Sequence, residues 1–424
     1  MPLFIPSSAA RPSERPIAPV QPGAETGTGT DNKPLPLTRP SPRSGRAALR
    51  LSPADREVLW LYLLTRLALW ITAYCARWLF PQNPDAHAPD SVLAPFQHWD
   101  WAHYMHIARD GYFPGGAGPA LSGWDNREAF FPGFPLLLRT VHLVVPHWTA
   151  AGLLISLAAG AVAVLALARI ARLHLRHPSA GRRAALFLLL SPCAVFLAVG
   201  YTEALFLALA LPAWLAAQRR HWPLAATLTA LAATVRVTGL FLAAAIALHF
   251  LLTARTHRRR RALPWLALPA LPAALYSWYL HAHTGDWMAW QHAQERGWHR
   301  TFHAPWEAWS RTWEAAFSHT QALGYAGMFQ AELLAMTAGL LLLALLLYRR
   351  RWPEALYLAL NLWALGTSYW YMSIPRATLV WWPLWIALTA WSLRRPRLTT
   401  ICLCLGAPLT TVVTLTFLTG RWAG

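Results

Sequence analysis

Charged side chains are scarce in this sequence, and acidic ones are the scarcest. Asp, Glu, Lys and Arg together make up 13% of the 424 residues, whereas hydrophobic residues make up 56%. Soluble domains carry roughly a quarter charged residues, so this composition excludes an ordinary soluble fold. Repeated apolar runs separated by short arginine clusters instead predict an all-α, polytopic membrane protein.

Cysteine is also rare, and basic charge is unevenly placed. Cys75, Cys193, Cys402 and Cys404 all lie in apolar runs, without CxxC or Cys/His spacing, and we expect small buried hydrophobes rather than disulfides. The net charge of +19 could indicate nucleic acid. The arginines, however, form short clusters between hydrophobic runs, as cytoplasmic loops do beside anionic lipid. We therefore expect membrane lipid, and no nucleic acid, as a partner.

The chain divides into a polar tail and a long apolar region. Residues 1–50 are basic and rich in proline, and no apolar run follows Met1, which predicts a disordered cytoplasmic tail rather than a signal peptide. Residues 51–424 are expected to form one transmembrane domain of about eleven helices. The expected spans are 57–80, 148–170, two arms in each of the hairpins 184–218 and 221–254, then 262–282, 329–348, 353–371, 377–393 and 398–419.

Two aromatic segments, 81–147 and 283–327, are expected to lie outside the membrane as extracytoplasmic loop regions. In the first of them, Pro132 and Pro135 predict a break in any helix.

The two hairpins are too short to span the membrane with ordinary helices. Only 35 residues separate the arginine clusters that end at Arg183 and begin at Arg219. Each arm then has about 16 residues and a length of roughly 24 Å, below the ~30 Å hydrocarbon core. Their turns should lie slightly below the outer surface, where non-helical backbone is tolerated only around a cavity. The hairpins should therefore bring Glu203 and Arg236 to the level of Asp100.

The segment His98–Tyr112 places Asp100 at the lip of a membrane span. A carboxylate there costs free energy unless it is partnered or functional, although an aspartate before a helix often only caps it. His103 and His106 follow at helical spacing, so the three side chains could bind a divalent metal. Interfacial histidines more often bond to water or lipid headgroups. A divalent metal is possible, and no cofactor is required.

Arg236 and Arg376 lie at outer turns, against the tendency of arginine to stay inside. A guanidinium binds phosphate well, so the pair suggests a lipid-phosphate substrate. A salt bridge of Arg236 with Glu203, or a contact with membrane phosphate, is the alternative. If the substrate is a lipid phosphate, Asp100 would act as general base toward an acceptor hydroxyl.

Several motifs follow one another in order between about 95 and 380. They are Trp99-Asp100 with His103-Tyr104, Ile107–Tyr112, Phe130–Pro135, Ser191-Pro192, Tyr201–Phe206, Arg236–Gly239 and Ser373–Arg376. Together they resemble the PIG-V family of mannosyltransferases, in the GT-C class of polytopic glycosyltransferases. Thr238 and Ala377 stand where that family usually has Asn and an aromatic residue.

The resemblance implies a GT-C-like bundle and an inverting enzyme. Its donor would be mannose on a polyprenyl phosphate, used from the extracytoplasmic side, and its acceptor a glycan, glycolipid or protein hydroxyl. Asp100 would be the catalytic base, Arg236 and Arg376 would hold the phosphate, and Glu203 would orient Arg236 or the sugar. His103 and Tyr201 are expected to contact the substrate as well.

Three alternatives remain open from the sequence. A transporter or flippase of a lipid-linked sugar would also need short hairpins and cavity charges, although inverted repeats are not visible. A GT-C enzyme using another sugar, or an inactive scaffold subunit, would share the motifs. All but one of the 37 basic residues are arginine, which favours a bacterial relative in the plasma membrane.

Overall fold

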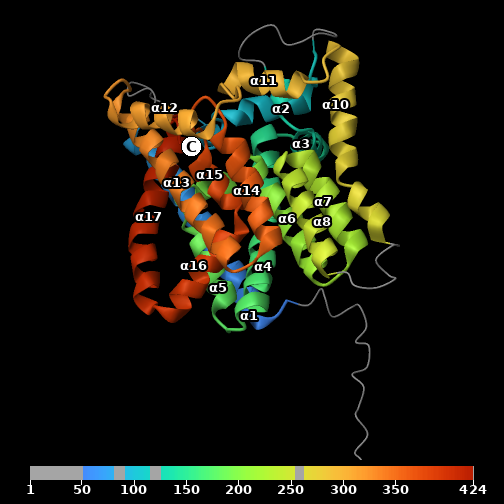
Figure 1. Cartoon of the computed structure of the whole chain (residues 1–424). Helices are drawn as coiled ribbons and strands as arrows, with labels where there is room; N and C mark the ends of the chain where they lie inside the picture. The colour runs from blue at the N-terminus through green and yellow to red at the C-terminus, as the bar shows by residue number, and fades with distance from the viewer. Residues whose placement is uncertain (1–50, 81–90, 115–125, 254–261, 424) are drawn as a thin grey trace, which may run out of the picture. The chain divides into compact units, whose positions relative to one another are not determined.

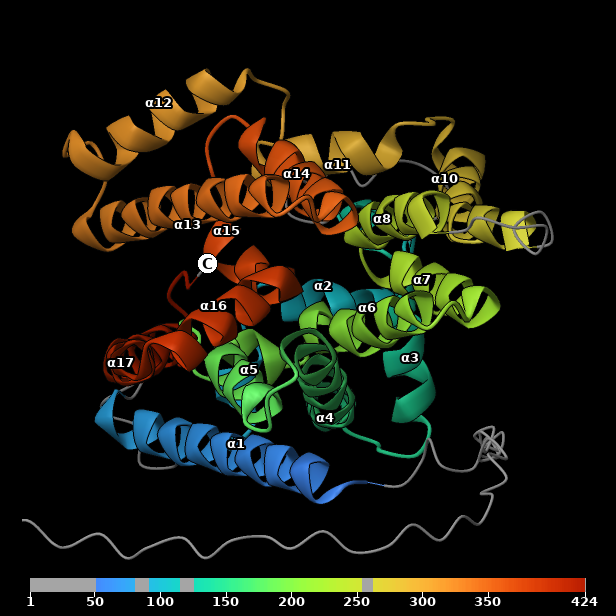
Figure 2. The same cartoon turned by 60° about the horizontal axis from the view of Figure 1, so that its bottom comes forward.

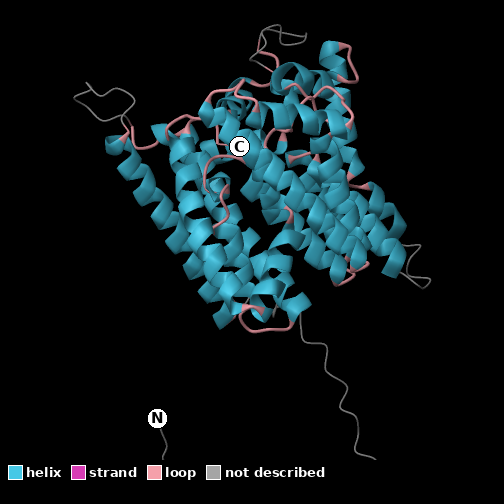
Figure 3. Cartoon of the chain, turned by 60° about the vertical axis from the view of Figure 1, so that its left-hand side comes forward, coloured by secondary structure: helices cyan, strands magenta, loops and turns pink. Residues whose placement is uncertain are grey.

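The regular structure of this protein is helical throughout the part of the chain that is described. The computed structural model describes residues 51–80, 91–114, 126–253 and 262–423, where every regular element is an α-helix or a 3-10 helix (Figure 3). This confirms the all-α class. The predicted tail, 1–50, and the arginine cluster at 255–261 lie outside the described residues.

Four described helices are long and apolar enough to cross a membrane, and seven shorter ones accompany them. The four are α1 (Pro53–Leu79), α4 (Trp148–Leu175), α13 (Leu323–Tyr348) and α17 (Pro396–Leu418). The seven are α5 (Ala180–Leu189), α6 (Thr202–Gln218), α7 (Trp222–Val235), α8 (Thr238–Thr253), α10 (Ala270–Thr284), α14 (Trp352–Gly366) and α16 (Trp382–Arg394). Each expected span overlaps one of these eleven, and the chain is an integral membrane protein.

The remaining helices lie between these spans. They are α2 (Asp100–Asp110), α3 (Gly133–His142), α11 (Ala289–Trp298), α12 (Pro305–Phe317) and the short α15 (Ile374–Ala377). The 3-10 turns are η2 (Ala94–Phe96), η3 (Arg127–Ala129), η4 (Ala194–Leu197), η5 (Leu263–Ala267) and η6 (Thr378–Val380). Figure 1 shows α2, α11 and α12 across one end of the bundle, which we call the loop end. In Figure 2, α4, α5 and α6 lie between α1 on one side and α8, α13 and α14 on the other.

The arginine-rich turns meet at the opposite end, which we call the basic end. Polar contacts there join the start of α1 to α4, the start of α5 to the end of α16, and the α13–α14 turn to the end of α4. These contacts are Arg169 Nη2 to Asp55 Oδ2 (3.0 Å), Arg183 Nη1 to the Ser392 carbonyl (2.6 Å) and Arg351 Nη2 to His174 Nδ1 (3.0 Å). These described arginine turns therefore share one end, as the positive-inside pattern requires of cytoplasmic turns.

The span expected at 353–371 ends early, so its last five residues were predicted wrongly. Residues after Gly366 leave the helix and pair with the segment that joins α11 to α12. The Tyr369 amide donates to the His299 carbonyl at 3.3 Å, and the His303 amide donates to the Thr367 carbonyl at 2.8 Å. These bonds satisfy backbone groups that a helix would otherwise satisfy.

The break expected at two prolines is also wrong in part. Pro132 precedes α3, but Pro135 lies inside its first turn. An amide in the first turn of a helix has no intrahelical partner, so its absence costs little there. The helix starts at Gly133, where a Cβ would come within 2.3 Å of Thr234 Oγ1, so glycine permits the close approach of α3 to α7.

The cysteines are free thiols, as expected, but they are not all buried. Cys193 is buried, Cys75 and Cys402 are partly exposed, and Cys404 is exposed on α17. The prediction of a buried side chain is wrong for Cys404, because α17 packs at the edge of the bundle and turns one side outward.

Trp101 anchors α2 between two glycines. Its ring is buried, and a Cβ added to either Gly152 of α4 or Gly200 would come within 2.5 Å of its Cζ3 atom. We expect Gly152→Val to push this ring aside and to lower the free energy of unfolding by about 1–3 kcal/mol. Thermal unfolding in detergent would measure this loss. Gly324→Val is the control, because no atom lies within 4 Å of a Cβ there; equal shifts for both variants would contradict the prediction.

Candidate functional site

A cavity of about 970 Å³ opens at the loop end of the bundle. Its wall combines side chains from α2, from the turns before α6 and after α7, from the α11–α12 linker and from α15. Those with hydrogen-bonding groups include Asp100, His103, His106, Asn126, Tyr201, Thr202, Arg236, Gln294, Arg300, Asn361 and Arg376. The cavity therefore collects segments from more than half the length of the chain.

Asp100 is the first residue of α2, and its side chain points to an arginine instead of capping the helix. The preceding residue, Trp99, has a φ of 56°, in a region that non-glycine residues rarely adopt. Such a conformation costs about 1–3 kcal/mol and persists only where surrounding contacts fix it. Asp100 Oδ2 accepts a hydrogen bond from Arg376 Nη1 at 2.7 Å. The capping role considered for this residue is not seen.

Glu203 lies in the first turn of α6 and is completely buried. Its Oε1 atom accepts from Arg236 Nη1 and from Arg376 Nε, both at 2.6 Å. A buried carboxylate is tolerated when it is paired in this way. Glu203 is not part of the cavity wall. Its bond to Arg236 fits the expected role of orienting that arginine, and a contact of Glu203 with substrate stays a prediction.

Arg236 lies at the turn between α7 and α8, where the second hairpin was expected to turn. Its Nη1 atom also donates to Thr202 Oγ1 at 2.7 Å. Gly239 makes the turn tight, because a Cβ at that position would lie 2.4 Å from the Ala233 amide nitrogen. The side chain of Arg236 is about a quarter exposed, at 24%, and reaches the cavity.

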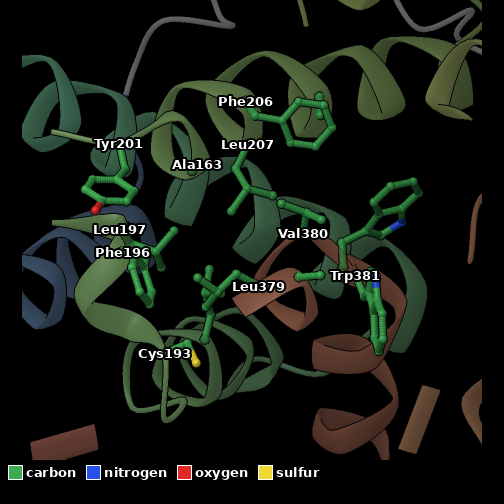
Figure 4. Packing of buried hydrophobic residues seen from close by; sticks show 14 of the residues in the cluster. Ala163, Cys193, Phe196, Leu197, Tyr201, Phe206, Leu207, Leu379, Val380 and Trp381 are labelled. Carbon is green, nitrogen blue, oxygen red and sulfur yellow. The ribbon is translucent and has the colours of Figure 1, made fainter. Parts of the chain in front are cut away.

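Arg376 binds both carboxylates, and its guanidinium packs against two aromatic rings. Its guanidinium lies 4.7 Å from the ring centres of Phe196 and Tyr201. Burial by itself lowers the pKa of Arg376, but the carboxylates of Glu203 and Asp100 raise that pKa well above the ordinary value. The connection after Arg376 is fixed as well, since Leu379 and Val380 pack in the same buried cluster as Phe196 (Figure 4).

Glu332, which the sequence analysis did not single out, positions the short helix that carries Arg376. It is a fully buried residue of α13, and its two oxygens accept from the amides of Ser373 and Ile374, each at 2.7 Å. Ser373 has a φ of 66°. The only signal in the sequence was a carboxylate inside a long apolar run, which by itself is a reason to suspect a role.

The histidines and Tyr201 line the cavity without forming a metal site. His103 stacks on Phe130, with ring centres 4.7 Å apart. Among the described residues no three His, Cys, Asp or Glu side chains converge closely enough to hold an ion, so Asp100, His103 and His106 do not form the suggested trio. The Tyr201 hydroxyl donates to the His98 carbonyl at 2.7 Å, which ties it to the segment before Asp100.

Two other acidic residues of the first outer segment do not reach the cavity wall. Asp110 pairs with its neighbour Arg109 at 2.8 Å, at the end of α2. Glu128 is buried and lies 4.0 Å from Arg296. The structure therefore brings Asp100, Glu203, Arg236 and Arg376 together and leaves these two apart.

Residues 75–260 match the family model described as "Mannosyltransferase (PIG-V)". A mouse (Mus musculus) protein named GPI alpha-1,6-mannosyltransferase 2 is 33% identical over 219 residues, which are 48% of this chain and 41% of the mouse protein. Its human (Homo sapiens) counterpart is 36% identical over 161 residues, or 36% of this chain and 31% of the human protein. This part of the chain is therefore similar to the PIG-V mannosyltransferases.

The PIG-V match covers only part of the candidate site. The matched segment contains Asp100, Glu203 and Arg236, whereas Arg300 and Arg376 lie beyond it. The chain spans less than half the length of these PIG-V relatives. The family match therefore includes one part of the site, and the residues of the other part were found from the structure.

Proposed function

We propose that this protein is a glycosyltransferase that moves mannose from a polyprenyl-phosphate donor to an acceptor hydroxyl at the loop end. The observation that supports this most is the chain of contacts from Asp100 through Arg376 and Glu203 to Arg236 on one cavity. We place this end on the extracytoplasmic side, because the arginine turns of the basic end suit the cytoplasmic side. The arginine-rich composition favours a bacterial plasma membrane.

Asp100 is suited to be the general base. Arg376 binds only its Oδ2 atom, and Oδ1 makes no hydrogen bond within the described part of the chain. In the proposed reaction Oδ1 takes the proton of the acceptor hydroxyl while the acceptor oxygen attacks C1 of the mannose. A base positioned in this way typically contributes ~10²–10⁴-fold. Attack from the face opposite the leaving group inverts the configuration at C1.

The bond from C1 to the phosphate oxygen breaks as the new bond forms, and the electron pair leaves with the lipid phosphate. Arg236 reaches the cavity, and its side-chain hydrogen bonds to the described residues all use Nη1. Its other N–H groups remain for the phosphate, where fixed charge stabilises a leaving group without reorganisation. Glu203 and Arg376 act as positioning residues that hold Arg236 and Asp100 at the same cavity.

The proposal is tested with the purified full chain in liposomes. Radiolabelled polyprenyl-phosphate mannose or GDP-mannose is supplied, with octyl α-mannoside and a cell-envelope lipid extract as acceptors. We expect label to move to an acceptor from the lipid donor only. Transfer from GDP-mannose, or passage of the intact lipid donor across the bilayer without transfer, would overturn the proposal; the latter result would identify a flippase.

A further inference from the structure

Arg300 is a cation on the cavity wall, and its guanidinium has no hydrogen-bond or ion-pair partner among the described residues. It lies two residues beyond the end of α11 and lines the same cavity as Asp100 and Arg236. Within the described ranges its guanidinium makes no hydrogen bond and no ion pair, in contrast to Arg236 and Arg376. Burial, together with the like charge of Arg236, lowers the pKa of Arg300 to about 10, so it stays protonated at neutral pH. An unpaired charge in such a place is costly unless a ligand offsets it.

The backbone around Arg300 is held in place rather than free. The Gln291 side chain donates to the Arg300 carbonyl at 3.2 Å, and His299 before it has a φ of 51°. The linker is also tied to residues 367–369 by two backbone hydrogen bonds. Since this second segment leads directly to Arg376, Arg300 and the Asp100–Arg376 pair are built on connected backbone.

The charges around the cavity do not balance. Glu332 is buried nearby, and its two oxygens accept from backbone amides. Among the described residues four guanidiniums line the cavity, those of Arg127, Arg236, Arg300 and Arg376. They share it with the carboxylate of Asp100, and Glu203 lies buried beside that pair. Asp100 and Glu203 already bind Arg376, and Glu203 also binds Arg236. The surplus positive charge therefore belongs to Arg300, and the complementary ligand is an anion.

We propose that Arg300 binds the phosphate of the lipid donor together with Arg236, and that it binds the departing lipid phosphate more tightly than the intact donor. This inference rests on the proposed function. The donor phosphate is a diester with one negative charge. Cleavage of the bond from C1 to oxygen leaves a monoester, which carries close to two at neutral pH because its second pKa is about 6. Arg376 is less suited, since its Nε and Nη1 groups already hold both carboxylates.

Binding of simple phosphates to the purified full chain in detergent tests this role without any sugar transfer. The probes are citronellyl phosphate, inorganic phosphate and uncharged citronellol, measured by calorimetry against the wild type, Arg300→Gln, Arg300→Lys and the control Arg139→Gln. Arg139 is exposed on α3 and does not line the cavity. We expect Arg300→Gln to weaken citronellyl phosphate binding by about ten- to hundredfold, Arg300→Lys to recover part of it, and citronellol binding to stay unchanged.

The outcomes separate this inference from the proposed function. If citronellyl phosphate competes with inorganic phosphate in the wild type and both depend on Arg300, the phosphate group itself is recognised. If Arg300→Gln binds citronellyl phosphate as the wild type does, or if Arg139→Gln weakens it equally, the role of Arg300 is refuted even where transfer occurs. If no transfer is found but binding still depends on Arg300, the phosphate site stands and the proposed reaction fails.

Discussion

Asp100→Asn is expected to reduce mannosyl transfer by about 10²–10⁴-fold while donor binding stays roughly the same. The amide is nearly isosteric and can still accept the hydrogen bond from Arg376 through its oxygen. It cannot take up the proton of an acceptor hydroxyl. Initial rates with labelled polyprenyl-phosphate mannose, alongside equilibrium binding of the same donor, measure the two effects separately.

Asp110→Asn is the matched control for this experiment. Asp110 belongs to the same helix but pairs with Arg109 and does not line the cavity. Transfer by this variant should equal that of the wild type. If Asp100→Asn kept full activity, or lost donor binding in proportion to rate, Asp100 would not be the base.

Arg376→Met is expected to lower the free energy of unfolding by about 3–5 kcal/mol and to abolish transfer. The side chain of Arg376 is only 10% exposed, and its loss would leave Asp100 without its ion pair and Glu203 with Arg236 alone. Breaking a buried pair from one side costs more than the pair itself contributes, because a charge is left in an apolar environment. Denaturant unfolding of the purified protein in mild detergent would measure the loss.

Two further variants make the result interpretable. Arg109→Met removes an exposed ion pair on α2 and should change stability by less than about 1 kcal/mol. Adding Glu203→Gln to Arg376→Met removes one buried charge and should restore part of the lost stability. An Arg376→Met protein as stable as the wild type would show that the Asp100–Arg376–Glu203 contacts do not hold the site together.

The sequence predicted the fold well because the membrane imposes a strong pattern on it. Apolar runs and arginine clusters give the spans and their alternation, and each expected span overlaps a helix. The short hairpins also predicted that Glu203 and Arg236 would lie at the level of Asp100, since two turns of similar depth reach the same level. That their side chains also lie side by side depends on how the helices pack, and the contacts through Arg376 show it.

Other parts of the site depend on contacts that no local pattern records. Arg300 is one of several arginines in the second outer segment, and only the fold shows that it reaches the cavity without an ion pair to any described residue. Glu332 acts through the backbone of Ser373 and Ile374, residues 41 and 42 positions away. The pairing of the α11–α12 linker with residues 367–369 likewise joins distant segments. Sequence periodicity shows where single helices form, but it does not show the contacts between separate segments on which these three features depend.

The family match ends at residue 260, and residues from both sides of that limit line the cavity. Asp100, Glu203 and Arg236 belong to the region shared with PIG-V proteins, whereas Arg300 and Arg376 come from the remainder of the chain. Hybrid proteins that exchange the region after residue 260 with a relative would therefore keep Asp100 and Arg236 and take positions 300 and 376 from the relative. Such chimeras would show whether the two halves of the cavity can be combined freely, or whether the Asp100–Arg376 contact requires both halves to come from one protein.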